Sequence, residues 1–178
     1  GKKGCLRTYG TKFINQLTDA GYHVIIRPHP QSAITEPEFI AKCKQETDNP
    51  LVIWDEEISP SHAMHKSQLL ISDTSSLRFD YAFLYAKPII TLQIPKDDLS
   101  EFEATDLDEF WHESAAHTIG AIANHETIMQ LPAMIKEVLN THTSLKLQSF
   151  KQQTVMNFGQ CAPNIVEHIN NLRKEEET

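Results

Sequence analysis

The chain has 178 residues, with 16 Lys plus Arg against 24 Asp plus Glu, which gives a formal net charge of −8. This length suits one α/β domain that can bury a core without disulfides or metals. The acidic balance argues against general nucleic-acid binding, which needs a basic surface, and gives no net attraction to an anionic membrane. Three widely separated cysteines are typical of reduced structural thiols.

The N-terminal segment 1–10 is loop-like in composition and leads into a helix expected at 11–20. A parallel α/β domain usually opens with a buried strand. We therefore expect residues 1–178 to form a single domain cut from a longer protein, whose first strand and N-terminal domain are missing here.

Apolar runs and turn residues predict alternating strands and helices along the rest of the chain. Strands are expected at 23–27, 51–54, 69–71 and 88–92, with a weak edge strand at 118–123. Helices are expected at 36–46, 59–66, 76–86, 126–140, 144–153 and 162–174, and a long loop with one helical turn at 96–113. Pro132 is expected to kink its helix or delay its start. This order predicts a Rossmann-like α/β fold, a parallel sheet with helices on both faces and two closing helices.

The turn Asp73–Ser76, between an apolar strand and a helix, is the first candidate site. A hydroxyl-rich turn at a helix N-terminus presents backbone N–H groups and the positive end of the helix dipole, which both favour phosphate. Thr74, Ser75 and Ser76 are therefore candidate phosphate ligands. Asp80, one turn further, is placed to accept hydroxyl protons from a ribose. The alternative is an ordinary Ser/Thr-capped helix with a surface Asp.

A second candidate site is His29, which is flanked by Pro28 and Pro30 in a rigid, extended loop after the strand at 23–27. Its imidazolium could stabilise or protonate a leaving phosphate, or it could be a loop histidine with only a packing role. Arg27 could pair with phosphate, or reach solvent at the end of its strand. Because ligands bind at the carboxyl ends of parallel strands, the loop around His29 and the 73–76 turn are expected at one rim.

Three patterns that resemble metal sites are discounted. His112, Glu113 and His117 are spaced one residue too long for the metalloprotease helix motif. His62 and His65 lack a further ligand, and Asp106-Leu107-Asp108 lies in an acidic loop, where a solvated charge run is the expected structure. We expect no metal and no cofactor.

The combination of motifs resembles one protein family. Arg27-Pro28-His29-Pro30, then Ser72–Ser76, then Phe79-Asp80 and Lys87-Pro88 is similar to the CDP-glycerol glycerophosphotransferase family of wall teichoic acid and related polymer synthesis. That family has a [KR]-P-H-P loop, a T-D-Y-S-S turn, an acidic residue in the following helix, and K-P before the next strand. The resemblance covers most of the chain.

The resemblance implies the C-terminal, nucleotide-binding half of a GT-B fold. It implies transfer of glycerol phosphate, or another polyol phosphate, from a CDP-polyol to a hydroxyl acceptor, with release of CMP and no metal. His29 would contact the donor phosphates catalytically, Ser75 and Ser76 would hold the diphosphate, and Asp80 the ribose. The cytosine would lie near 54–58. The full-length protein would be cytoplasmic and peripheral on the inner face of the cell membrane, touching it only through the missing parts.

Two departures from the family pattern concern the turn, where Thr74 replaces the usual Tyr and Ser72 the usual Thr. They leave phosphate binding plausible but the polyol open. The missing N-terminal half would bring the acceptor site and the general base, so we expect the isolated chain to bind donor and to turn over little or none. Two alternatives are a UDP-sugar 2-epimerase or glycosyltransferase-like domain, which predicts a carboxylate pair where Phe79-Asp80 stands, and a non-catalytic α/β binding module.

Overall fold

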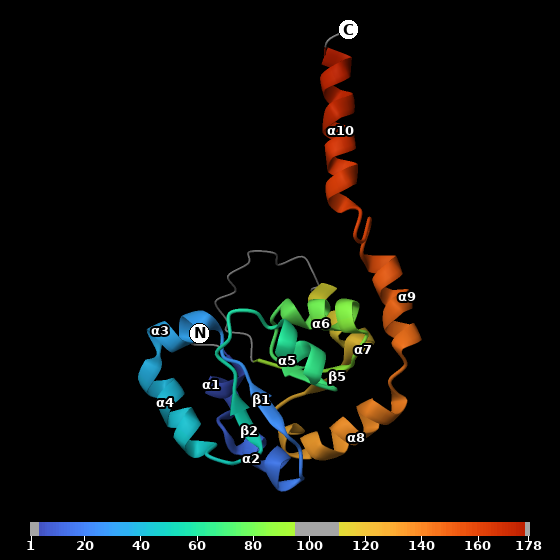
Figure 1. Ribbon diagram of the computed structural model, residues 1–178. Coiled ribbons are helices and arrows are strands. Elements are labelled where there is room, and N and C mark those ends of the chain that lie inside the picture. Colours follow the sequence, from blue (N-terminus) through green and yellow to red (C-terminus); the bar gives the residue numbers. More distant parts are fainter. Residues whose placement is uncertain (1–3, 95–110, 177–178) are drawn as a thin grey trace, which may run out of the picture.

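A computed structural model describes residues 4–94 and 111–176, with side chains to residue 174 (Figure 1). Short strands alternate with helices along the described chain. The strands are β1 (Val24–Ile26), β2 (Val52–Trp54), β3 (Leu70–Ser72), β4 (Ile89–Leu92) and β5 (Gly120–Ala123). The helices before β4 are α1 (Cys5–Tyr9), α2 (Lys12–Asp19), α3 (Pro30–Thr35), α4 (Pro37–Glu46), α5 (Ser61–Lys66) and α6 (Leu77–Tyr85). The later helices are α7 (Trp111–Ile119), the 3-10 turn η1 (Ile128–Gln130), α8 (Leu131–Thr141), α9 (Ser144–Thr154) and α10 (Cys161–Glu176).

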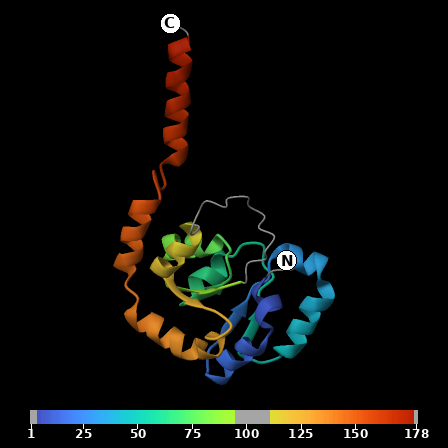
Figure 2. The ribbon, with the colours of Figure 1, turned by 180° about the vertical axis from the view of Figure 1, so that it is seen from behind.

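All strand pairs in the described chain are parallel, which confirms the predicted Rossmann-like α/β class. The strands form two separate sheets, however: β1 pairs with β2, and β3, β4 and β5 form a second sheet in that order. Figures 1 and 2 show β1 and β2 on one side of the molecule with α3 and α4, and the three-stranded sheet on the other with α5, α6 and α7.

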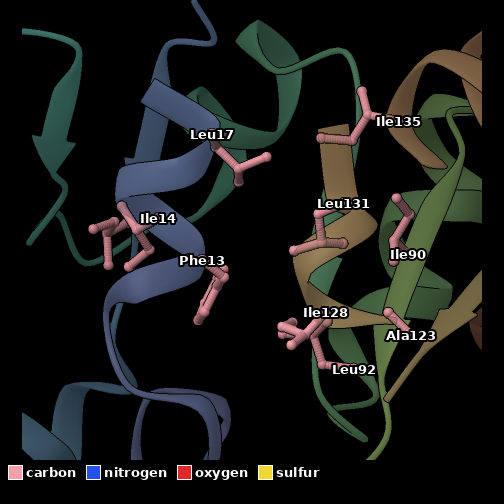
Figure 3. Packing of buried hydrophobic residues seen from close by; sticks show 10 residues of the cluster. Phe13, Ile14, Leu17, Ile90, Leu92, Ala123, Ile128, Leu131 and Ile135 are labelled. Atoms are coloured by element: carbon pink, nitrogen blue, oxygen red, sulfur yellow. The ribbon is translucent and has the colours of Figure 1, made fainter. Parts of the chain in front are cut away.

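Helices cover both faces of the three-stranded sheet. Successive side chains of β4 point to opposite faces and are buried against these helices. Ile90 and Leu92 pack into a core with α2 and α8 that includes Phe13 and Leu131 (Figure 3). Ile89 packs on the other face, in a second core formed with α5, α6, α7 and α9. Burial on both faces explains why β4 reads as a continuous apolar run.

The close approach of β4 and β5 depends on a glycine. A Cβ atom on Gly120 would lie 1.7 Å from the carbonyl oxygen of Ile89, a distance that no side chain can occupy. This edge strand was expected to begin at Thr118, but Thr118 and Ile119 end helix α7 instead. Ala115 and Ala116 of that helix are buried, and Ile119 packs with Ile89 of β4 in the second core.

Three local predictions were wrong. Residues 5–9 form helix α1 rather than a loop, and residues 30–35 form helix α3 instead of continuing the extended loop after His29. Residues 111–113, expected in a loop, begin α7. In α3, the fixed φ of Pro30 suits the first helical position, where its missing N–H has no cost. The rest of the loop expected at 96–113, including Asp106 and Asp108, lies outside the described residues.

The C-terminal part of the chain confirms one expectation and changes another. Pro132 delays its helix: the chain forms η1 first, and α8 begins at Leu131 with the proline in its first turn. α9 packs against the main body through buried Leu147. α10 projects away from the body and does not close it (Figures 1 and 2), and its side chains are exposed from Cys161 to Lys174.

Candidate functional site

The loop after β1 is held by Arg27, whose guanidinium already has several partners. Its Nη1 donates to Oδ2 of Asp55, which follows β2, at 2.7 Å. Its Nη2 donates to the carbonyl oxygens of Glu57 and, at 2.9 Å, of Ile58. Arg27 therefore ties the loop containing His29 to the 55–58 segment. A phosphate would bind Arg27 only by sharing or replacing these bonds, so its role as a phosphate ligand stays a prediction.

The pKa of Asp55 lies below its usual value of 3.8. The main cause is a hydrogen bond from the backbone N–H of Glu57 to Oδ1, and the bond and charge of Arg27 add to it, while partial burial opposes them. The carboxylate is thus fixed in its ionised form, and the ion pair with Arg27 is intact at neutral pH.

His29 lies at the N-terminus of α3, with its side chain exposed. Its Nδ1 accepts a hydrogen bond from the backbone N–H of Gln31 at 3.2 Å, which caps the helix. An accepting Nδ1 carries no proton, so an imidazolium at this position would lose the cap. With the cap in place, the ring hydrogen stands on Nε2, which can donate a hydrogen bond to a phosphate oxygen without giving up the proton.

The turn after β3 is organised by Asp73. Its Oδ1 accepts from the backbone N–H of Ser75 and its Oδ2 from that of Cys5, both at 3.2 Å, so one carboxylate joins the turn to the start of α1. The Ser75 hydroxyl accepts from the N–H of Leu77 at 3.3 Å. Two amides at the turn, those of Ser75 and Leu77, are thus occupied by local side chains. Long, exposed bonds of this kind are the ones that a phosphate could replace.

The hydroxyl residues of the turn remain accessible. Thr74, Ser75 and Ser76 are exposed, and Ser76 is the N-cap residue of α6 without a side-chain hydrogen bond to the helix. Asp80 is exposed in the first turn of α6. These side chains therefore lie at the surface around the N-terminus of a nine-residue helix.

Arg78 is a residue of this region that sequence reasoning missed. Its side chain is only 1% exposed and lies beneath the turn. Its Nε donates to the carbonyl oxygen of Ser75 at 3.1 Å and its Nη1 to the hydroxyl of Thr91 in β4 at 2.9 Å, while Nη2 has no partner. Desolvation lowers the pKa of Arg78, and the nearby Asp73 charge opposes that effect. Sequence gave no signal for this role, because an arginine in a helix is normally a surface residue.

Lys87, part of the K-P motif, has a structural position. Its Nζ donates to the carbonyl oxygens of Met64, His65 and Ser67 at 3.2, 2.6 and 2.7 Å, at the C-terminal end of α5. A cation there satisfies the unpaired carbonyls and the negative end of the helix dipole. The conformation of the α5–β3 connection is thereby fixed, and with it the start of the strand that precedes the turn.

A cavity of about 710 Å³ joins parts of the two predicted motifs. Arg27 and His29 from the loop after β1, and Asp73 from the turn after β3, line it. The cavity thus connects the loop after β1 with Asp73 of the turn, and its lining also extends to His23 and Gln68 before the two strands. Thr74, Ser75, Ser76 and Asp80 do not line this cavity and lie outside it on the surface.

A second hollow, of about 500 Å³, lies at the end of β2, where the cytosine was expected. Its lining includes the backbone segment 54–57 together with His62 and Lys66 from α5. Lys66 also lines the larger cavity, so the two hollows are neighbours.

The described residues contain no group of three or more His, Cys, Asp or Glu side chains arranged to hold a metal ion. In the same part of the chain, no helix is both long and apolar enough to cross a membrane. The cysteines differ in exposure: Cys43 is buried, Cys161 is exposed, and burial together with the charge of Asp73 raises the pKa of Cys5 to about 12.

Comparison with known proteins gives one match. The model of the CDP-glycerol:poly(glycerophosphate) glycerophosphotransferase family matches residues 7–170, which is most of the chain and includes both motif segments. No curated protein and no solved structure is significantly similar to the chain.

Proposed function

The chain belongs to the CDP-glycerol:poly(glycerophosphate) glycerophosphotransferase family, and on this premise we propose that it binds the donor of a polyol-phosphate transferase. The donor is CDP-glycerol or another CDP-polyol, and the acceptor is a hydroxyl group of a cell-surface polymer or its lipid-linked precursor. The observation that carries the proposal is the meeting of Arg27, His29 and Asp73 at one cavity. A parallel sheet binds its ligands at this edge.

The proposed reaction is an in-line displacement at the phosphorus that carries the polyol. The acceptor oxygen forms a new bond to this phosphorus, and the bond to the oxygen bridging the two phosphates breaks. CMP leaves with the electron pair, and the acceptor proton passes to a general base supplied by another part of the protein. His29 and the N-terminus of α6 offset the negative charge that develops on CMP.

The binding roles follow the surface around the turn. Ser75 and Ser76 donate hydroxyl and N–H hydrogen bonds to the diphosphate, replacing the long local bonds that the turn now makes. Thr74 stands beside them, and Asp80 accepts from the ribose hydroxyls. The cytosine occupies the hollow formed by the 54–57 segment. Arg27 acts by holding this segment against the His29 loop, and contributes directly where the phosphates approach its guanidinium.

The wider setting is also a proposal. The chain would be the C-terminal half of a GT-B enzyme of teichoic-acid-type polymer synthesis, working at the cytoplasmic face of the cell membrane through other parts of the protein. Because the acceptor site and base would lie in the other half, the isolated chain should bind CDP-glycerol and transfer little or none. Rapid transfer from CDP-glycerol by this chain alone would contradict this assignment.

The first test is calorimetric titration of the chain with CDP-glycerol, CMP and UDP-N-acetylglucosamine. We expect the cytidine ligands to bind best, and His29→Ala and Ser76→Ala each to weaken CDP-glycerol about tenfold, the effect of losing one hydrogen bond to a charged group. His168→Ala and Ser149→Ala are matched controls, since both side chains are exposed, on α10 and α9, and line neither hollow.

The other outcomes separate the alternatives. Preference for the uridine ligand would favour an epimerase or glycosyltransferase-like domain. Such a domain is expected to have a pair of carboxylates where this chain has Phe79 and Asp80. If neither cytidine nor uridine nucleotides shift the melting temperature of the chain, a non-catalytic binding module is favoured. The 73–76 turn would then act only as a helix cap.

A further inference from the structure

The carbonyl oxygen of Ser75, in the turn before α6, is held by two donors of one residue. The backbone N–H of Arg78 donates to it at 3.3 Å, and the Nε–H of the same residue donates to it at 3.1 Å. The regular bonds of an α-helix join only backbone groups, so the bond from Nε is an addition that the side chain makes. The side chain of Arg78 therefore helps to fix the direction of this carbonyl group.

The peptide bond between Ser75 and Ser76 passes this direction on to the N–H of Ser76. No described peptide bond is cis, and in a planar trans peptide the C=O and N–H point in opposite directions. Since the carbonyl points toward the buried side chain of Arg78, the N–H of Ser76 points away from it, toward the exposed face of the turn. Within the described residues this N–H makes no hydrogen bond, whereas the amides of Ser75 and Leu77 are bonded to local side chains.

The guanidinium of Arg78 also ties the turn to the three-stranded sheet. Its Nη1 donates to the hydroxyl of Thr91 at 2.9 Å. Thr91 is the register partner of Ser72, the last residue of β3, and its side chain is buried. Because β4 is paired on both edges, Thr91 is a fixed point in the core of the sheet. The peptide group that carries the free N–H is thereby anchored to this point.

The positive charge of Arg78 is not consumed by a hydrogen-bonded ion pair. A guanidinium keeps its proton in proteins. The buried Nη2 has no hydrogen-bond partner in the described part of the chain, and the carboxylate of Asp73 at the same turn bonds to the amides of Ser75 and Cys5 instead. An apolar side chain of similar volume would avoid the cost of an unpaired buried donor. Stability alone therefore does not account for an arginine at this position.

An anion at the exposed face of the turn would use both features. The N–H of Ser76 is available as a donor, and the guanidinium lies on the opposite side of the same peptide group. Charges interact more strongly through the protein interior than through water. The carboxylate of Asp73 repels an anion at this turn, and the partial positive charge at the N-terminus of α6 is only about half of a unit charge. Arg78 supplies the positive charge that offsets this carboxylate.

We propose that Arg78 is a positioning residue of the diphosphate site at the turn. Its side chain orients the N–H of Ser76 toward the phosphate and places a positive charge beneath it. The phosphate does not contact Arg78, which acts through the Ser75–Ser76 peptide group and through its charge. This inference rests on the proposed function because it takes the turn as the site of the donor phosphates, but it does not depend on the nucleoside.

The test is an NMR titration of the ¹⁵N-labelled chain with inorganic pyrophosphate, a diphosphate without a nucleoside. In the parent we expect the amide signal of Ser76 to shift as pyrophosphate binds. Arg78→Met should weaken the affinity about tenfold, the effect of losing a charge-assisted contribution to anion binding. Its melting temperature should stay within about 4 °C of the parent, which separates lost binding from lost stability. Equal affinities of the parent and this variant would overturn the proposal.

Arg78→Lys is the conservative variant. A lysine keeps the positive charge but lacks the planar fork that bonds Ser75 and Thr91 together, so we expect a loss of only about threefold. This variant also keeps the test open if Arg78→Met does not fold. A lysine variant with the full affinity of the parent would then show that the bonds to Ser75 and Thr91 do not orient the site, and would contradict the proposal.

Arg173→Met is the matched control for net charge. Arg173 is exposed on α10 and lines neither hollow, so its loss should leave the affinity for pyrophosphate unchanged. A loss equal to that of Arg78→Met would assign the effect to the overall charge of the chain and would contradict the proposal.

The same titrations with CDP-glycerol distinguish a failure of this inference from a failure of the proposed function. If Arg78→Met weakens pyrophosphate binding but CDP-glycerol binds no better than pyrophosphate, the role of Arg78 is supported and the donor assignment fails. If CDP-glycerol binds the parent and Arg78→Met equally, the donor assignment is supported and the role of Arg78 is overturned. An amide signal of Ser76 that neither ligand shifts would also overturn it, because the turn would then bind no diphosphate.

Discussion

The two sheets of this molecule are built from similar apolar strands but differ in how they are buried. β4 has neighbours on both edges and helices on both faces, and Ile89, Ile90 and Leu92 are fully buried. β1 and β2 form a pair whose residues are mostly half-buried, and the free edge of β1 faces the cavity. The difference teaches that burial in a parallel sheet is decided by the number of neighbours a strand has, more than by its composition.

The largest effect is expected at the contact of β4 with β5. Gly120→Ala places a Cβ against the Ile89 carbonyl, so the sheet must separate there, and we expect a loss of at least about 3 kcal/mol in the free energy of unfolding. Urea denaturation followed by circular dichroism measures it. Gly21→Ala is the control: with φ +84 and nothing within 4 Å, it should cost only the backbone strain of about 1–2 kcal/mol. Equal losses in the two variants would show that the contact is not tight.

A paired substitution compares the two regions directly. Ile90 and Ile71 are register partners, one fully buried in β4 and the other beside the cavity. We expect Ile90→Ala to cost about 3–4 kcal/mol and Ile71→Ala less than about 2, because the second side chain already adjoins empty space. Urea denaturation of the parent and both variants, fitted with the same m-value, measures the two losses in the free energy of unfolding. Similar costs would mean that the cavity closes in solution.

A buried cation distinguishes the β3–β4–β5 sheet from the β1–β2 sheet. Arg78→Ala leaves a void and removes the bonds to Ser75 and Thr91, and should destabilise the fold by about 3 kcal/mol. Arg78→Met keeps most of the volume without a buried charge, so it should stay within about 1 kcal/mol of the parent. Thermal unfolding of both variants measures the two losses. Equal destabilisation by Arg78→Ala and Arg78→Met would show that the charge and hydrogen bonds of Arg78 stabilise the fold, and that its volume does not.

The smallest effect is expected in the β1–β2 region, at the ion pair of Arg27 and Asp55. Asp55→Asn should lower stability at pH 7 by about 1 kcal/mol, the upper range for a partly exposed pair. Since the folded-state pKa of Asp55 lies below 3.8, this contribution is fully present above that pH and is lost as the pH falls through the folded pKa. Melting temperatures of parent and variant should therefore converge in acid. A constant difference down to pH 2 would exclude the charge as the cause.

Much of the fold follows from local sequence. Short apolar runs between turn residues predicted all five strands that the structure describes, although β5 was expected to begin at Thr118. Pro37 predicted the start of α4, while Pro132 was expected inside a helix that it would kink or delay.

Asp73 after β3 lines the same cavity as Arg27 and His29 after β1, while Thr74, Ser75, Ser76 and Asp80 lie outside it. The meeting of the two motifs at one rim therefore stays a prediction for these exposed residues.

The rest depended on contacts between distant residues. Nothing near Arg78 in the sequence indicates that it is buried on Thr91, and nothing near Arg27 indicates its bonds to 55–58. Residues 5–9 look like a loop because α1 is a single turn of helix, which becomes stable through tertiary contacts such as the bond from Cys5 to Asp73. The sequence by itself determined the α/β class, the family and the positions of the candidate motifs. Only the tertiary structure decided which of their polar groups are already bonded and which edges of the sheet are free, because these depend on long-range pairing that short-range patterns do not encode.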